Sequence, residues 1–382
     1  MRFAKRECRG RGCLPRHSPT PFGNSPQHRP KRGGLERCSY ASVLPRIAEH
    51  NDPHPTPFPS PPEGTVLTIG TFDGVHLGHR ALVERAVAVA SAVAAGGGKR
   101  AHVVVLAFDP SPMEVLSPEK APARLTTFAQ REKLLREAGA DRVVRLVPTT
   151  ELLALEPAEF VSRLVAEYRP RAIVEGADFR FGARRGGDVG LLRSLGETHG
   201  FSVELVEQVE LSLSDNTVAP ARSTAIRSLV AQGRVSDATC LLGRPYAMAG
   251  KVVPGDRRGR TIGFPTANLD SPCLAPADGV YAGRARLADG RVMAAAISVG
   301  TKPTFGPHRR AVEAYLIDDS RTGLKGEAWA PIDGLPEYGW EMELEFLAFL
   351  RDQVQFATVE ALLEQMGRDC AECAEICRRT RA

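Results

Sequence analysis

Long apolar runs are missing from this chain of 382 residues. It holds no stretch of the roughly 18 apolar residues that a membrane-spanning helix needs, and no short apolar block near the N-terminus that would make a secretory leader. We therefore expect a cytoplasmic protein without membrane contact. Aromatic residues are also few, at 6%, but hydrophobic residues make up 43% and charged residues 25%. The latter fractions are typical of globular proteins, and the length suffices for two domains with separate cores.

A regular cysteine framework is absent as well, because the eight cysteines stand at irregular positions. Their spacing excludes a small disulfide-stapled fold. Cys370, Cys373 and Cys377 follow an i, i+3, i+7 pattern that places them on one helix face. We interpret them as packing residues of a last helix and keep a metal or redox site as the alternative. Neither a histidine nor a fourth thiol stands close enough in sequence to complete a tetrahedral zinc set.

The formal net charge of +5 is concentrated at the N-terminus. Residues 1–60 carry 11 Lys/Arg against 4 Asp/Glu and hold 10 of the 29 prolines, so the rest of the chain has 39 basic and 41 acidic residues. This basic, proline-rich segment has no hydrophobic period, and we expect it to be disordered. An upstream translation start, a tail that contacts phosphates, and a targeting leader remain three open explanations.

From Val66 to Val209, short β-branched runs alternate with segments of helical period. TVLTIGT, AHVVVLAF, DRVVRLV, RAIVEG and FSVELVEQV are strand candidates, and the stretches between them carry helical patterns. Strands separated by helices predict a parallel sheet covered by helices on both faces. We therefore expect an α/β, Rossmann-like first domain.

After Gly243 the pattern changes to alternating strand-like segments divided by Gly, Pro and Asp turns. The candidates are YAMAGKVV, GVYAGRARL, RVMAAAISVG, AVEAYLID and MELEFLAFLR. They predict an antiparallel β-barrel closed by one helix from about Thr358. The predicted organisation is a tail over 1–62, an α/β domain over 63–242 and a barrel domain over 243–382.

The stretch TIGTFDGVHLGH, residues 68–79, joins the first predicted strand to the first predicted helix. In open parallel sheets, ligands bind beyond the carboxyl ends of strands, and phosphates bind at helix N-termini. His76 and His79 stand three residues apart, so both can face one ligand and stabilise charge that develops on a phosphorus during in-line attack. We predict that these two histidines are catalytic. The predicted nucleotide-binding residues of this loop are Gly70, Thr71, Phe72, Asp73 and Gly78.

The His-x-Gly-His sequence resembles that of a nucleotidyltransferase superfamily whose members transfer a nucleotide from a nucleoside triphosphate and release pyrophosphate. A second part of that pattern is a Ser/Thr and Arg cluster that opens a later helix. ARSTAIRSLVAQG supplies this cluster at residues 221–233. Hydroxyl and guanidinium groups suit a triphosphate. The resemblance thus adds three nucleotide-binding residues: Ser223, Thr224 and Arg227.

A second glycine-framed basic loop, GKVVPGDRRGRTIGFPTANLD, occupies residues 250–270. Phosphoryl transfer needs a cation, ligands for it, backbone donors around the phosphates and a base for the accepting hydroxyl. Thr266 and Asn268 offer hard oxygens that suit Mg²⁺, and Gly263 is a predicted nucleotide-binding position. Glu313 lies among apolar neighbours on a predicted strand, where partial burial would raise its basicity. We predict that Glu313 is a catalytic base.

Taken together, these motifs resemble the bifunctional riboflavin kinase/FAD synthetase family of bacteria from about Thr65 to Asp369, including GTFDGVHLGH, EGADFRFGARRGGD, RSTAIR, GRTIGFPTANL and DGVYAG. The resemblance implies a barrel that makes FMN from riboflavin and ATP, and an α/β domain that makes FAD from FMN and a second ATP. It also implies that the partners are these small molecules rather than a specific nucleic acid, and it leaves a weak homo-oligomer open. Under this interpretation His76 and His79 serve adenylyl transfer, Glu313 accepts a proton from the ribityl hydroxyl, and Thr266 and Asn268 hold Mg-ATP. A flavin and nucleotide wall would include Asp178, Phe179 and Phe181.

Three positions depart from the family pattern. Ser111 stands where the family usually has a histidine between two prolines, Arg222 replaces the first of two serines, and Leu324-Lys325-Gly326 replaces a usual Leu-Tyr-Gly. One alternative is therefore a riboflavin kinase with an impaired adenylyltransferase domain. Two more hypotheses stay open: a different H-x-G-H nucleotidyltransferase, and a flavin or nucleotide sensor whose basic tail contacts nucleic acid.

Overall fold

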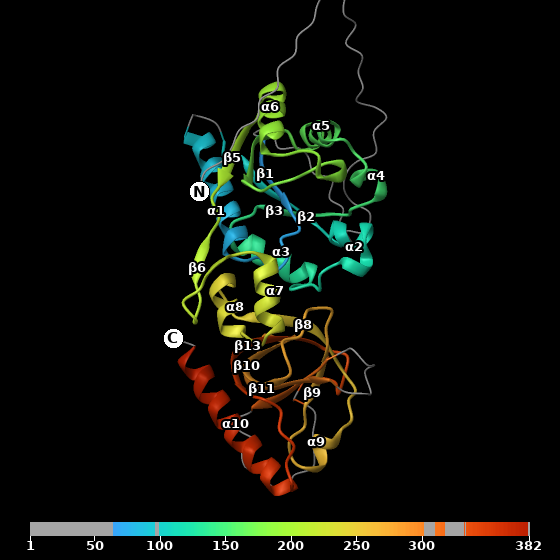
Figure 1. Cartoon of the computed structure of the whole chain (residues 1–382), viewed down its shortest axis with the longest axis vertical. Coiled ribbons are helices and arrows are strands. Elements are labelled where there is room, and N and C mark those ends of the chain that lie inside the picture. Colours follow the sequence, from blue (N-terminus) through green and yellow to red (C-terminus); the bar gives the residue numbers. More distant parts are fainter. Residues whose placement is uncertain (1–63, 96–98, 302–309, 318–331, 333, 381–382) are drawn as a thin grey trace, which may run out of the picture. The chain divides into compact units, whose positions relative to one another are not determined.

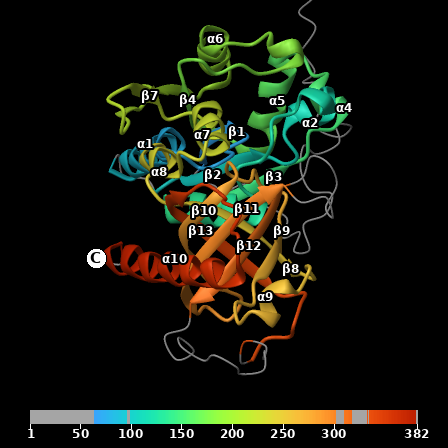
Figure 2. The same ribbon diagram turned by 60° about the horizontal axis from the view of Figure 1, so that its bottom comes forward.

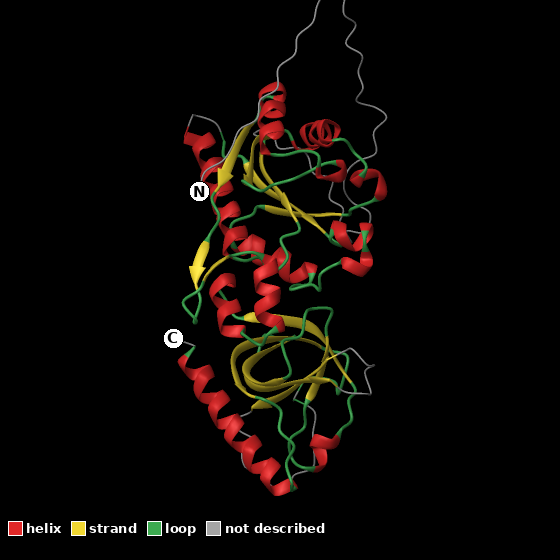
Figure 3. Cartoon of the chain, viewed as in Figure 1, coloured by secondary structure: helices red, strands yellow, loops and turns green. Residues whose placement is uncertain are grey.

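The computed structural model describes residues 64–95, 99–301, 310–317, 332 and 334–380. The expectations for the N-terminal segment and for Leu324-Lys325-Gly326 concern residues outside these ranges. An α/β part comes first in the chain, followed by an antiparallel barrel and a C-terminal helix (Figures 1 and 3). The predicted fold class is confirmed.

A five-stranded sheet in the order β3-β2-β1-β4-β5 forms the centre of the α/β part, and every neighbouring pair is parallel. Its strands lie close to the predicted runs, and the runs of β1, β2 and β4 are apolar enough to be covered on both faces. In β1, for example, residues 65–69 are all buried. The strands are β1 (Thr65–Gly70), β2 (His102–Phe108), β3 (Arg142–Leu146), β4 (Pro170–Gly176) and β5 (Ser202–Val206).

Helices cover both faces of this sheet and give it two apolar cores. On one face α1 and α3 pack against the strands, and on the other face α5 and α6 do so. Helix α3 begins in a capping box in which Thr127 and Gln130 satisfy each other's backbone donors. The helices are α1 (Leu77–Ala95), α2 (Pro112–Leu116), α3 (Phe128–Glu137), α4 (Thr150–Leu153), α5 (Pro157–Tyr168) and α6 (Val189–His199), with short 3₁₀ turns at Pro118–Lys120 and Ala183–Arg185.

Two helices, α7 (Ser223–Ala231) and α8 (Val235–Leu242), follow a hairpin formed by β6 (Glu210–Ser212) and β7 (Val218–Pro220). Their buried side chains belong to the same apolar cluster as the barrel residues Tyr246, Leu344 and Phe346. The apolar core therefore continues across the domain boundary predicted at residue 242. The position of that boundary stays a prediction.

The barrel is closed in the order β10-β11-β12-β9-β8-β13, and all six neighbouring pairs are antiparallel (Figure 2). Five of its strands match the predicted segments, whereas the short β9 begins inside the GFPTAN motif. The elements are β8 (Tyr246–Val253), α9 (Arg258–Thr261), β9 (Ala267–Asp270), β10 (Gly279–Leu287), β11 (Val292–Thr301), β12 (Arg310–Ile317) and β13 (Glu341–Arg351).

Helix α10 (Val359–Arg379) contacts β10, β11 and β13 from outside the barrel. Thr358 caps it by accepting a hydrogen bond from the Ala361 N–H. Cys373 and Cys377 are buried on its inner face, and the Cys377 thiol lies 3.1 Å from the carbonyl of Gly283. Burial raises the pKa of the Cys370 thiol to about 11. The packing role predicted for these cysteines is confirmed.

In the part of the chain that the structure describes, no helix combines the length and the apolar character needed to cross a bilayer.

Candidate functional sites at the sheet edge and on the barrel

A cavity of about 380 Å³ opens at the carboxyl ends of β1, β4 and β5. The strand order reverses between β1 and β4, and such a reversal is where open α/β sheets bind ligands. The lining comes from four separate segments of the sequence. It includes Gly70 to Phe72, His76, Gly78, His79, Glu175 to Phe179, Val206 to Val209, Ala221 and Arg222.

The loop from Thr71 to His76 has an unusual backbone. Phe72 and Val75 have positive φ angles of 51° and 39°, and Gly74 between them has a φ of 84°. Non-glycine residues in this region carry conformational strain that the surroundings must offset. Gly78 is needed for a different reason: a Cβ there would lie 2.9 Å from the carbonyl of Ala221 and 3.1 Å from the His76 ring.

Asp73 fixes this loop from inside the protein. Its carboxylate accepts hydrogen bonds from the backbone N–H groups of Leu125 and Thr126, at 2.9 to 3.0 Å, and pairs with Arg227 at 2.6 Å. The hydroxyl of Ser223 donates to the Asp73 carbonyl at 2.7 Å. The structure thus brings together Asp73, Ser223 and Arg227, which sequence analysis predicted as nucleotide-binding residues, and Ser223 and Arg227 both contact Asp73 directly. Thr224, in the first turn of α7, is exposed.

His76 and His79 both line the cavity, and their rings stack with centroids 3.6 Å apart. The pKa of His76 is lowered to about 3, mainly by burial and also by the charge of Arg244, while Asp73 acts in the opposite direction. Burial also lowers the pKa of His79 well below its ordinary value, with His76 and Arg244 contributing. Both imidazoles are therefore neutral at neutral pH. Among the described residues His79 Nδ1 is buried without a hydrogen-bond partner, so it is available to a ligand.

Glu175 was not predicted from the sequence, yet it lies at the base of the cavity. Its carboxyl group accepts a 2.7 Å hydrogen bond from the Ile69 N–H, just beyond the last register pair of β1 and β4, Leu67 with Ile173. The side chain thus replaces a strand partner where the two strands separate. Burial raises the pKa of Glu175 well above its ordinary value.

The predicted flavin wall divides into two layers. Asp178 and Phe179 line the cavity, whereas Phe181 is buried behind Phe179, with the two rings stacked at 5.5 Å. Asp178 forms an ion pair of 3.1 Å with Arg222, which also lines the cavity and stands at the N-cap of α7. The arginine that departs from the family pattern therefore lies beside a predicted flavin residue.

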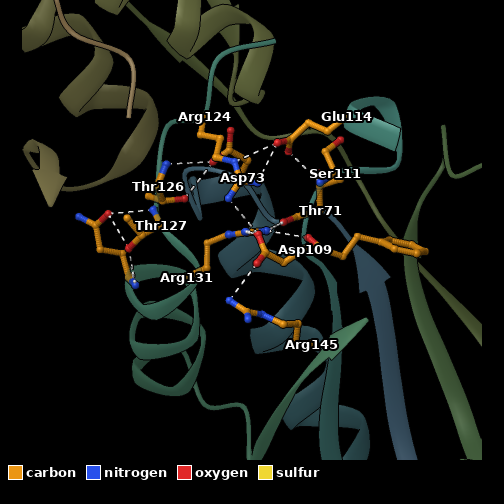
Figure 4. A network of polar contacts seen from close by, with 12 residues as sticks. Thr71, Asp73, Asp109, Ser111, Glu114, Arg124, Thr126, Thr127, Arg131 and Arg145 are labelled. Atoms are coloured by element: carbon orange, nitrogen blue, oxygen red, sulfur yellow. Dashed lines mark hydrogen bonds and ion pairs between the residues drawn. The ribbon is translucent and has the colours of Figure 1, made fainter. Parts of the chain in front are cut away.

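A charged network supports the other side of the nucleotide loop (Figure 4). Asp109, just after β2, forms ion pairs with Arg124, Arg131 and Arg145. Arg131 also donates to the carbonyl of Thr71 at 2.7 Å and so connects α3 to the end of β1. Ser111, the other departure in this domain, forms a capping box with Glu114 at the start of α2 and is not one of the cavity-lining residues.

The second candidate site lies on the outer face of the barrel. Val312 and Ala314 belong to the barrel core, so Glu313 between them faces outward, because strand side chains alternate. Its register partners are Asn268 on β9 and Ser298 on β11. Directly opposed residues of antiparallel strands have neighbouring side chains, and the structure therefore brings the predicted base next to the predicted metal ligand.

The loop between β8 and β9 covers this outer face. Phe264 from the loop contacts Tyr315 at 5.0 Å between ring centroids, and a Cβ on Gly255 would lie 2.1 Å from the Asn268 amide. Thr266 is half-buried next to β9, and Gly263 has a φ of 82°, which favours glycine. Asn268 Oδ1 is buried and has no hydrogen-bond partner among the described residues.

The predicted residues thus form two separate groups. Those of the first motif, together with Asp178, Phe179, Ser223 and Arg227, surround the sheet edge. Gly263, Thr266, Asn268 and Glu313 gather on the barrel. Sequence reasoning missed Glu175, Arg131 and Asp109. For Glu175 and Asp109, the position at the end of a predicted strand, β4 or β2, was a signal that could have identified them. No comparable signal marked Arg131.

Two family models match the chain. The FAD synthetase model covers residues 58–218, which contain most of the sheet-edge cavity, and the riboflavin kinase model covers residues 242–377, which contain the barrel group. A solved structure from Streptococcus pneumoniae, described as a macrolide-efflux protein, has a TM-score of 0.67 to this chain at 29% identity. The similarity covers 81% of this chain and 93% of that one.

Curated relatives span almost the same length. The bifunctional riboflavin kinase/FMN adenylyltransferase of Escherichia coli strain K12 is 34% identical over 312 residues, which cover 81% of this chain and 92% of the relative. The protein of the same description from Listeria monocytogenes is 32% identical over 308 residues, which cover 80% and 90%. With both models matched in order and relatives aligned over nine tenths of their length, the chain belongs to the bifunctional riboflavin kinase/FMN adenylyltransferase family.

Proposed function

We propose that this enzyme phosphorylates riboflavin with ATP on the barrel and then transfers an adenylyl group from a second ATP to FMN at the sheet edge. The observation that carries the proposal is the separation of the two groups of residues, each inside the matching family model. The products are FMN and ADP from the first reaction, and FAD and pyrophosphate from the second.

In adenylyl transfer, a phosphate oxygen of FMN attacks the α-phosphorus of ATP, and the bond from that phosphorus to pyrophosphate breaks. The residues proposed to act on this centre are His76 and His79. Because both are neutral, they would donate N–H hydrogen bonds to the phosphorus oxygens, and these bonds strengthen as negative charge grows in the transition state. Gly70, Thr71, Phe72, Asp73 and Gly78 would form the loop that admits the triphosphate.

The segment that opens α7 would complete the nucleotide site. Ser223 and Arg227 hold Asp73, and the exposed side chains of Thr224 and Arg222 would contact a phosphate. Asp178 and Phe179 would form the flavin side of the cavity. Phe181 would act from behind, by fixing the ring of Phe179.

In the kinase reaction, Glu313 would accept the proton of the ribityl hydroxyl as that oxygen attacks the γ-phosphorus and ADP leaves. Asn268 Oδ1 is a buried acceptor without a protein partner in the described ranges, and such an oxygen fits a hard cation. Thr266 and Asn268 would therefore hold Mg²⁺ with ATP. Bound Mg²⁺ neutralises charge on the ATP phosphates. Gly263 would allow the loop backbone to approach the nucleotide.

These roles require small-molecule substrates that are present inside cells, and we propose a cytoplasmic location with riboflavin, FMN and ATP as partners.

The test is an assay with two products. Full-length protein and a variant lacking residues 1–62 are each supplied with riboflavin, ATP and Mg²⁺, and FMN and FAD are separated and measured over time. We expect both products from both proteins. Formation of neither product would reject the proposal, and formation of FMN alone would support the alternative of a kinase with an impaired adenylyltransferase domain.

A further inference from the structure

Arg244 stands in the short turn between α8 and β8, at the start of the barrel sequence. It lies inside the residues matched by the riboflavin kinase model and outside those matched by the FAD synthetase model. Its guanidinium group nevertheless contacts the nucleotide loop of the sheet edge, about 170 residues earlier in the chain.

The contact is a fork of hydrogen bonds to main-chain carbonyls. Arg244 Nη2 donates to the carbonyl of Gly74 at 2.6 Å, and Nη1 donates to that of Val75 at 2.9 Å. These are the two residues before His76, and both have positive φ angles. The planar guanidinium can hold two acceptors in fixed directions, which a lysine ammonium cannot do in the same way.

The neighbouring residue Gly243 packs against the residue that follows His76 in the same segment. Its φ is 70°, and a Cβ at this position would lie 2.6 Å from Leu77 Cδ2. Leu77 follows His76 and begins α1. The turn formed by Gly243 and Arg244 thus touches the residues on both sides of His76.

The charge of Arg244 acts on the same histidines. Burial lowers the pKa of Arg244 to about 10, so it remains a cation at neutral pH. After burial it is the largest influence on His76, whose other charged neighbours are Asp73, Arg227 and Arg222. It also acts on His79, together with His76, Arg131 and Arg227. The cation therefore helps to keep both imidazoles neutral.

We propose that Arg244 is a positioning residue of the adenylyl-transfer site: it holds the Gly74 and Val75 carbonyls so that His76 keeps its direction toward the cavity. This inference rests on the proposed function. It assigns a residue of the kinase-matched sequence to the chemistry of the other site.

The test compares Arg244→Gln and Arg244→Lys with a control, Arg286→Gln, in the full-length protein. Arg286 and Arg244 both line a second cavity, of about 220 Å³, which is distinct from the sheet-edge cavity. The ion pairs of Arg286 are with Glu343 and Glu345 on the barrel. Three quantities are measured for each protein: FAD formation from supplied FMN, FMN formation from riboflavin, and the pKa of His76 by NMR.

For both Arg244 variants we expect kcat for FAD formation to fall about 10²-fold, the scale of misplacing a catalytic group, with FMN formation unchanged. The two variants should differ in the pKa of His76, which rises toward its ordinary value in Arg244→Gln and stays low in Arg244→Lys. Arg286→Gln should match wild type in all three measurements.

Wild-type FAD rates in both Arg244 variants would overturn the inference. A parallel fall in FMN formation would also overturn it, because Arg244 would then support the fold as a whole. Absence of FAD formation by the wild-type protein would instead reject the proposed function, and the pKa of His76 would still show whether Arg244 acts on that ring.

Discussion

The imidazole rings of His76 and His79 are stacked, with centroids 3.6 Å apart and planes inclined by 21°. At this spacing two protonated rings would repel each other strongly, since little water separates them. Burial keeps both rings neutral, and each neutral imidazole still has one ring N–H that can donate a hydrogen bond to a developing anion. The close stacking of the two rings therefore depends on the low pKa values that keep them uncharged.

We predict that His79→Ala lowers FAD formation by about 10²-fold or more, because one transition-state contact of this kind contributes on that scale. FMN formation should remain near wild type. Both products are measured in one reaction, with His199→Ala as the control, since His199 is exposed at the end of α6. An equal loss of both products would contradict the two-site assignment.

Glu313→Gln should have the opposite effect. Loss of a general base costs about 10² to 10⁴ in rate, so FMN formation should fall within that range while FAD formation from supplied FMN is retained. The amide keeps the size of the side chain next to Asn268 but cannot accept a proton from the hydroxyl. Glu341→Gln, at the exposed start of β13, is the control. A wild-type kinase rate in Glu313→Gln would exclude Glu313 as the base.

Glu175→Gln should stabilise the protein, and more so at higher pH. Burial raises the pKa of Glu175 in the folded state, so its contribution to stability is complete below its ordinary pKa of 4.5 and is lost as the pH rises through the raised value. Glutamine can still accept from the Ile69 N–H but has no proton to lose. Melting temperatures at about pH 5 and about pH 8 test this, with exposed Glu197→Gln as the control. A difference from wild type that is the same at both pH values would show that Glu175 does not titrate in this range.

Arg222→Ser tests whether this departure from the family pattern has a binding role. A hydrogen bond between a cation and a phosphate contributes enough to change an affinity about tenfold, so KM for ATP or FMN in adenylyl transfer should rise by about that factor. The KM increase should shrink at high salt, because Arg222 is half exposed beside Asp178. Exposed Arg180, which is not one of the cavity-lining residues, provides the control Arg180→Ser. Unchanged KM values for both substrates would show that Arg222 binds neither substrate and only forms its ion pair with Asp178.

Much of the fold was predictable because it follows from local periodicity. The apolar run of β1 and the alternation of Val312, Glu313 and Ala314 on β12 each report burial directly. The position of His76 and His79 beyond the end of β1, where α1 begins, followed from the same reasoning. The four residues of β9 were too few to show a period.

Contacts between distant residues could not be read in this way. Asp73 meets Arg227 across 154 positions, and Arg244 meets Gly74 across 170. Neither pair shares a motif, and a charged side chain near a glycine loop gives no sign of whether it binds a ligand or the protein. Phe181 shows the same limit, because the spacing of two residues from Phe179 did not reveal that one ring lies behind the other.

The apolar core that joins α7 and α8 to the barrel has a consequence for exchanging parts between relatives. A cut at Gly243 would leave Leu229, Val230, Leu241 and Leu242 on one fragment and their partners Tyr246 and Phe346 on the other. Each fragment would expose an apolar surface and tend to aggregate. In this chain, therefore, a unit transplanted as a kinase would need the β6 hairpin, α7 and α8 in addition to the barrel strands, and even that cut would separate Leu125 of the α/β part from its partners in this cluster.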